Sequence, residues 1–269
     1  MKTHQSTNST SSTNFVRFFV VTLLVCCLGL GGLNYTVNPF GFYAPHLVRQ
    51  LTWDEVQLKT SLMRQQPSPD ILILGSSRVM TIAPEDVQAQ TGQSAFNAGT
   101  GAASPLDSCA VFRYALESLH WHPRELILGI DVNGFNHPFA NQAVLATQEL
   151  SPYLPRAAKW AGLWERWNVL LSTGQIIASL KSLRLALRKT GYPSPSVQFA
   201  ADGLALLPAG DQWEDRNLKE AIRFWSLQDA DFNEFSVDQQ RSFEEMLQVA
   251  VAHNIKVVGY ITPFHPSLL

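Results

Sequence analysis

The chain has 269 residues and a formal net charge of −2, and 46% of its residues are hydrophobic. This near-neutral balance, with no Lys/Arg cluster in the folded part, argues against a nucleic-acid-binding protein. Cys26 and Cys27 lie within an apolar run and Cys109 stands alone after it, so the folded part can form no internal disulfide.

The amino-terminal part differs in composition from the rest of the chain. Residues 1–14 are rich in Ser, Thr and Asn and predict a disordered tail. Residues 18–33 contain no charged residue, and with the flanking apolar and aromatic residues they predict a transmembrane helix over residues 15–35. A cleaved signal peptide and a buried helix are the alternatives. No small-x-small cleavage site follows the run, which favours an uncleaved signal anchor.

The basic residues around this segment predict its orientation. Lys2 and Arg17 precede the span, and the next basic residue is Arg49. The positive-inside rule therefore predicts a cytoplasmic amino terminus, a single pass through the inner (cytoplasmic) membrane, and an extracytoplasmic domain.

A polar connector over residues 36–69, with a short helix after Trp53, leads into alternating strands and helices. Four strands are predicted, at residues 71–74, 94–97, 126–130 and 256–261. Between the first two, a turn and a short helix end at Gly92, and later helices begin at the N-caps Ser104 and Ser236. The pattern predicts an α/β domain with a parallel sheet over residues 70–269.

Residues 137–235 interrupt the alternation and predict a mostly helical insertion. Trp160, Trp164 and Trp167 repeat at helical spacing within it. We interpret them as core residues or as part of a lid over the site rather than as a sugar platform.

The stretch that points most directly to a reaction is the first strand, which runs straight into Gly75-Ser76-Ser77-Arg78. Open α/β sheets bind ligands beyond the carboxyl ends of their strands, which favours a catalytic serine here. The alternative is that Ser76 and Ser77 cap the following helix.

The next two strands also end in polar or Gly-rich turns, at residues 97–102 and at Asp131-Val132-Asn133. Acyl transfer needs a nucleophile, a base and donors aimed at the developing oxyanion. Ser77 could supply the nucleophile, the Gly-rich turn a backbone N–H, and Asn133 a side-chain amide.

These turns resemble the SGNH (GDSL-like) hydrolase superfamily, particularly its membrane-anchored bacterial members. Residues 74–78 are similar to the first block of that family, with Ser76 in place of the usual Asp. The resemblance implies that Ser77 is the nucleophile.

The second and third blocks of the family imply the oxyanion hole. Residues 97–102 are similar to the second block, whose glycine falls on Gly101 or Ala102. Asp131-Val132-Asn133 resembles the third block, with Asp131 in place of a glycine and Asn133 as the side-chain donor.

The resemblance implies a flavodoxin-like three-layer α/β/α sandwich and ester hydrolysis or acyl transfer through an acyl-serine, without metal or cofactor. No His/Cys/Asp/Glu cluster in the sequence has metal-ligand spacing.

The family's Asp-x-x-His block is missing, and the sequence ends eight residues after Ile261. We therefore expect a carboxyl-terminal truncation that lacks its base. Ser76, Asp131 and His265 are candidates for substrate contact.

The expected function is that of an extracytoplasmic serine esterase or O-acyltransferase acting on acylated cell-envelope glycan or lipid, with this chain alone impaired by the missing base. The alternative is a non-catalytic envelope protein that uses the same fold to bind glycan or partner subunits. The departures at Ser76 and Asp131 and the missing Asp-x-x-His block favour this alternative.

Overall fold

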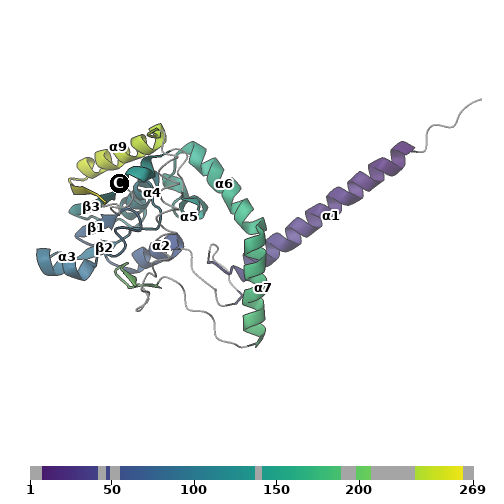
Figure 1. Ribbon diagram of the computed structural model, residues 1–269, viewed down its shortest axis with the longest axis horizontal. Helices are drawn as coiled ribbons and strands as arrows, with labels where there is room; N and C mark the ends of the chain where they lie inside the picture. Colours follow the sequence, from purple (N-terminus) through teal and green to yellow (C-terminus); the bar gives the residue numbers. More distant parts are fainter. Residues whose placement is uncertain are drawn as a thin grey trace, which may run out of the picture. The chain divides into compact units, whose positions relative to one another are not determined.

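The computed structural model describes residues 8–41, 47–48, 55–136, 141–188, 198–206 and 234–262 (Figure 1). The chain divides into two compact units, residues 1–52 with 166–193, and residues 53–165 with 194–269. The expected insertion, residues 137–235, is therefore shared between the two units.

The first unit contains helix α1, Asn8–Val37. The mean hydropathy reaches 2.2 over the most apolar stretch of its segment Thr13–Val37, and the helix is long and apolar enough to cross a membrane. Residues 8–14, which we predicted to be disordered, are helical, because extending an existing helix is much easier than nucleating one. Residues 1–7 lie outside the described residues.

Two further helices, α6 (Arg156–Leu171) and α7 (Thr173–Arg188), confirm the helical prediction for the first part of the insertion. Trp160, Trp164 and Trp167 on α6 are 74%, 70% and 59% exposed, so their interpretation as core residues is wrong. Helical spacing places side chains on one face but does not say what covers that face.

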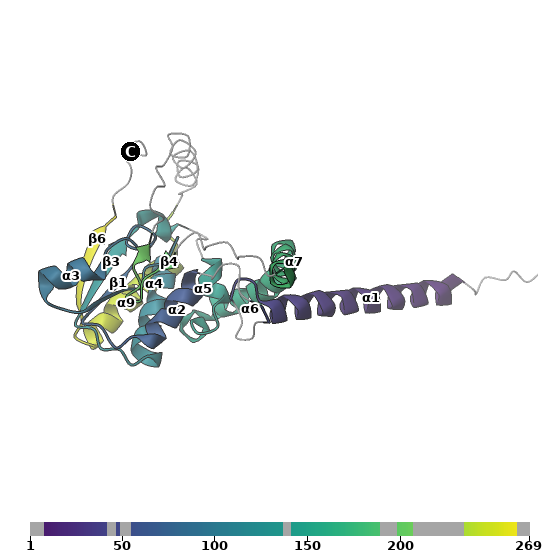
Figure 2. The same ribbon diagram turned by 90° about the horizontal axis from the view of Figure 1, so that it is seen from below.

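The second unit is built on a four-stranded parallel sheet with the strand order β2-β1-β3-β6. The strands are β1 (Ile71–Leu74), β2 (Ala95–Asn97), β3 (Glu125–Ile130) and β6 (Lys256–Ile261). This confirms a mixed α/β domain with a parallel sheet. Strand β1 pairs on both sides and is buried along its whole length. Among the described strands, β6, yellow in Figure 2, pairs with β3 alone and forms one edge of the sheet.

Apolar side chains cover both faces of this sheet. Leu72 and Leu74 point to the larger core, which they share with α4 (Pro105–Arg113) and α9 (Val237–Ala252). Ile71 and Ile73 alternate to the other face, where they pack with the turn after β1 and with α3 (Pro84–Thr91).

The helices of this unit begin and end where the local sequence directs. Ser104 caps α4 in a reciprocal capping box with Asp107, and Ser236 caps α9, as predicted. Helix α3 ends at Gly92, whose φ of 73° is readily adopted only by glycine.

Helix α2, Glu55–Gln65, belongs to the α/β unit, although we assigned residues 36–69 to a connector. Val56 and Met63 lie in the larger core, and Lys59 and Thr60 are buried beside them. Because polar residues occupy part of the buried face of α2, its apolar residues do not recur regularly at helical spacing in the sequence.

The other elements among the described residues of the second unit are short. They are the π-helix η1 (Tyr114–Ser118), the 3-10 helices η2 (Val132–Phe135) and η3 (Ser151–Tyr153), helix α5 (Gln142–Ala146), and the antiparallel strands β4 (Gln198–Phe199) and β5 (Ala205–Leu206).

Candidate functional site

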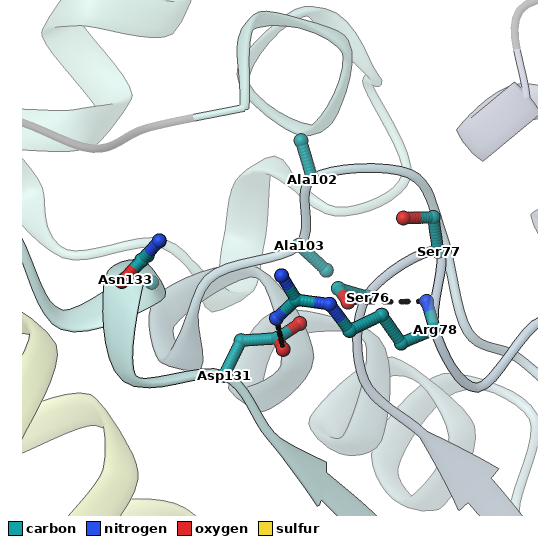
Figure 3. A pocket seen from close by; sticks show the side chains of 8 residues that line it. Ser76, Ser77, Arg78, Ala102, Ala103, Asp131 and Asn133 are labelled. Atoms are coloured by element: carbon teal, nitrogen blue, oxygen red, sulfur yellow. Dashed lines mark hydrogen bonds and ion pairs between the residues drawn. The ribbon is translucent and has the colours of Figure 1, made fainter. Parts of the chain in front are cut away.

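A shallow pocket opens at the carboxyl-terminal edge of the sheet, where β1, β2 and β3 end (Figure 3). Its space amounts to about 370 Å³, open solvent included. The lining residues are Ser76, Ser77, Arg78, Ala102, Ala103, Asp131, Asn133 and Gly134. Five of the residues predicted for the site therefore meet here. Gly101 does not line the pocket, and His265 lies outside the described residues.

The two serines after β1 have different environments. Ser77 is exposed, and Figure 3 shows its hydroxyl turned toward the pocket. Ser76 is buried, and its Oγ accepts a hydrogen bond from the Arg78 backbone N–H at 3.3 Å. Helix α3 begins only after its N-cap, Ala83, so neither serine caps it and the capping alternative is wrong. Ser77 is the hydroxyl that a substrate can reach.

The turn that presents Ser77 is held by the buried side chain of Val79. Glycines lie near the carboxyl ends of the three neighbouring strands, and a Cβ at Gly99 or Gly129 would overlap Val79. Gly75 adopts a φ of 140°, and a Cβ there would lie 2.8 Å from the Gly129 carbonyl oxygen. We expected the Gly-rich second turn to offer a backbone N–H to a substrate, and one of its glycines, Gly99, makes room for Val79 instead.

The structure separates the two oxyanion candidates of the second turn. The Gly101 N–H donates to Glu55 Oε1 at 2.6 Å, and Gly101 does not line the pocket. Ala102 lines it and adopts a φ of 52°, in the left-handed region that alanine seldom occupies. Such a conformation costs about 1–3 kcal/mol and is typical of functional sites.

Asp131 is the counter-ion of Arg78 inside the pocket. Its carboxylate accepts hydrogen bonds from the Arg78 guanidinium and from the Thr262 hydroxyl, and Arg78 Nη1 lies 3.2 Å from Thr262 Oγ1. Asp131, which we predicted as a candidate for substrate contact, thus lines the pocket as the partner of Arg78. The pairing is visible in the sequence only if β1 and β3 are recognised as neighbours.

Asn133 lies on η2, directly after β3. Figure 3 shows it on the opposite side of the pocket from Ser77. A side-chain amide in this position can donate across the pocket to a group held near Ser77.

Asn97 ties the first two turns together. Its Nδ2 donates to the carbonyl oxygens of Val79 at 2.7 Å and Ile82 at 2.9 Å, and its Oδ1 accepts from the Gly99 N–H at 3.0 Å. The side chain is fully buried, so these bonds fix the turn of Ser77 against the end of β2.

Lys59 joins α2 to the end of β2. Its Nζ donates to the Asn97 carbonyl oxygen at 2.7 Å and to the Gly203 carbonyl oxygen between β4 and β5. Burial lowers the pKa of Lys59 to about 7, although the nearby Glu55 and Asp202 carboxylates act to raise it. Sequence analysis missed Lys59 because its partners lie far away along the chain.

The histidines among the described residues lie at the other edge of the sheet. His120 and His122 precede β3, and His253 ends α9 just before β6. His137 lies outside the described residues, as does His265. Within the described part of the chain, no group of three or more His, Cys, Asp or Glu side chains could hold a metal ion.

An apolar hollow adjoins the pocket and shares Ala103 and Asp131 with it. It lies between β3, the beginning of α4 and α9, and holds about 270 Å³, open solvent included. Its apolar side chains are those of Leu128, Ile130, Phe135, Phe243 and Met246.

Comparisons with known proteins found no family model, curated protein or solved structure that matches this chain. The functional conclusion therefore depends on the residues at the pocket.

Proposed function

We propose that the protein is a serine esterase or O-acyltransferase of the SGNH type, with Ser77 as its nucleophile. The observation that carries the proposal is the pocket, which combines an exposed serine, Ala102 and Asn133 at one sheet edge. Ligands of open α/β sheets bind at that edge. The strand order also equals the first four strands of the flavodoxin-like order, which supports a fold of that type.

In the proposed reaction, Ser77 Oγ attacks an acyl carbonyl carbon and loses its proton to a base. The carbonyl oxygen becomes an oxyanion, to which the backbone N–H groups of Ser77 and Ala102 and the Asn133 amide donate. Collapse expels the alcohol and leaves an acyl-serine. Water then releases the acid, or an acceptor alcohol takes the acyl group.

The surroundings of the pocket suit an acylated substrate. The adjoining hollow offers apolar side chains to the acyl group, and the Arg78–Asp131 pair offers polar atoms to a glycan or lipid headgroup. Helix α1 would anchor the enzyme in the inner membrane with its amino terminus in the cytoplasm. Acylated cell-envelope glycans or lipids are the proposed substrates.

Hydrolysis of short p-nitrophenyl esters by the full chain in detergent tests this proposal. Ser77→Ala should lower kcat, and the loss should exceed that in Ser76→Ala, because the nucleophile is removed. Ser76→Ala is the matched control, because the Ser76 hydroxyl is buried and accepts a bond from the Arg78 backbone N–H. Equal hydrolysis by the wild type and Ser77→Ala would contradict the proposal.

The Arg78–Asp131 pair favours a second candidate, a non-catalytic protein that binds glycan hydroxyls or a partner subunit. A fixed pair of opposite charges orients polar groups without any reaction. Binding of glycan fragments that is lost in Asp131→Asn and unchanged in Ser77→Ala, without ester hydrolysis, would support this candidate.

A further inference from the structure

Helix α7 buries polar side chains and exposes apolar ones. Gln175 and Ser179 are 1% and 0% exposed, and Ser182 is fully buried as well. On the outer face, Ile177 and Leu187 are 67% and 84% exposed. A helix surrounded by water has the opposite arrangement, so this face suits apolar surroundings.

A second exposed apolar stripe runs along α6. Its members recur at helical spacing and are Trp160, Leu163, Trp164, Trp167 and Leu171. Tryptophan is enriched where a protein crosses from lipid to water, because the indole ring is apolar and its N–H is polar.

The same two helices concentrate positive charge. Residues 156–188 contain six basic residues and one acidic residue, a net charge of +5 in a chain whose total is −2. The basic residues do not form a run in the sequence, which is why we found no cluster there. On α7, Lys181, Arg184 and Arg188 follow Ile177 at helical spacing and so share its face. Their long apolar stems can lie along lipid while the charges reach the headgroups.

In the first unit, which contains α1 and α7, α7 packs beside the carboxyl-terminal end of the apolar stretch of α1. Asn34 Nδ2 donates to the Leu170 carbonyl oxygen at 2.7 Å, and Ser179 Oγ donates to Asn34 Oδ1 at 2.8 Å. Gly31 lies against the side chains of Leu170 and Leu171. Small residues and buried side-chain hydrogen bonds are how helices associate in a bilayer. The α6–α7 junction therefore lies at the level where a spanning α1 would leave the hydrocarbon.

We propose that α7 and the exposed stripe of α6 lie in the headgroup region of the bilayer that α1 spans. The partner is a lipid surface, with the indole rings and Ile177 in the outer acyl layer and the basic side chains on anionic headgroups. This second membrane contact is independent of the esterase proposal, since no residue of the pocket takes part in it.

A fluorescent label at one exposed apolar position tests the proposal in the full chain, reconstituted into phosphatidylcholine–phosphatidylglycerol vesicles. Ile177→Cys carries an NBD label, and Val251→Cys on α9 is the matched control, because Val251 is also an exposed apolar helix residue, 75% accessible. Both chains carry Cys26→Ser and Cys27→Ser. Burial raises the pKa of the Cys109 thiol to about 12, so it stays unlabelled.

We expect the label at position 177 to emit as in an apolar medium and to be quenched by brominated lipid, while the label at position 251 emits as in water. Water-like emission at both positions would overturn the proposal.

Quenching of the native tryptophans by brominated lipid provides a test without labels. The wild type should lose a larger fraction of its emission than the Trp160→Phe/Trp164→Phe/Trp167→Phe chain. Equal quenching of the two chains would overturn the part of the proposal that concerns α6.

Discussion

At the residue scale, the pocket separates groups that can act on a substrate from groups that hold the backbone in place. Ser77, Ala102 and Asn133 line it, whereas Gly101 and Asn97 hold the surrounding turns through hydrogen bonds. This distinction leads to different expectations for substitution at each position.

Asn133→Ala should lower kcat for ester hydrolysis by about 10²–10³-fold with little change in KM, because an oxyanion donor acts mainly in the transition state. The p-nitrophenyl ester assay measures both constants. Asn136→Ala, at the end of the same short helix and away from the pocket lining, is the control. An unchanged kcat in Asn133→Ala would exclude this residue from the oxyanion hole.

Lys59 should make the stability of the α/β unit depend on pH. Its pKa is about 7 in the folded chain and 10.5 when unfolded, so between these values the unfolded state binds more protons. The free energy of unfolding should therefore rise with pH across that window, by at most about 5 kcal/mol. Urea unfolding in detergent at both ends of the window measures the change.

Lys59→Met should remove this contribution, whereas Lys256→Met, at an exposed position on β6, should keep it. The same pH dependence in the wild type and Lys59→Met would show that Lys59 is not the group responsible.

At the scale of elements, α2 holds the second turn of the site through Glu55. Glu55→Ala removes the acceptor of the Gly101 N–H and should lower kcat by about tenfold, because Ala102 would lose its fixed orientation. Glu55→Gln keeps an acceptor oxygen and should restore most of the activity. If Gln and Ala at this position were equally impaired, the hydrogen bond would not be the cause.

The packing of Val79 against the strand-end glycines predicts a coupled pair of substitutions. Gly129→Ala should destabilise the α/β unit by about 1–3 kcal/mol, because the added methyl group overlaps Val79. In a Val79→Ala background the same change should cost less, since the overlapping atoms are gone. Unfolding free energies of the four chains measure the coupling, and simple additivity would contradict the packing argument.

The strands and the lining of the pocket could be predicted from the sequence because their signals are local. Ile71–Leu74 is a short apolar run bounded by turn residues, and Ser104 and Ser236 are ordinary N-caps. Ser77, Ala102 and Asn133 could be placed together because parallel strands end at one edge. To predict the Asp131–Arg78 pair, one would also need to know that β1 and β3 are neighbours in the sheet.

Other features could not be predicted because their partners are distant in sequence. Lys59 bonds to Asn97 and Gly203, which are 38 and 144 residues away. The exposed face of α7 has the same period as a buried face, and the pattern does not state whether protein or another apolar medium lies against it.

At the scale of the whole molecule, the two units place apolar residues in opposite ways. The α/β unit encloses a continuous core, whereas the unit of α1 and α7 buries Asn34, Gln175 and Ser179 and exposes apolar side chains. The link between α1 and α7 should therefore depend on its polar bonds.

Asn34→Leu should loosen the end of α6 and α7 from α1, because it removes the bonds to Leu170 on α6 and to Ser179 on α7, each worth about 1 kcal/mol in a membrane. Trypsin should then cleave faster after the basic residues of α7 in reconstituted chain. Thr36→Val is the control, because the Thr36 hydroxyl donates to carbonyl groups of its own helix. Equal cleavage rates in Asn34→Leu and the wild type would argue against this link.

The most direct test of Ser77 as the nucleophile is covalent labelling of the full chain by an organophosphonate, with the modified peptide identified by mass spectrometry. We predict an adduct on Ser77 that disappears in Ser77→Ala and persists in Ser76→Ala. A folded chain that shows no adduct at Ser77, or equal labelling after Ser77→Ala, would contradict the proposed acyl-serine chemistry.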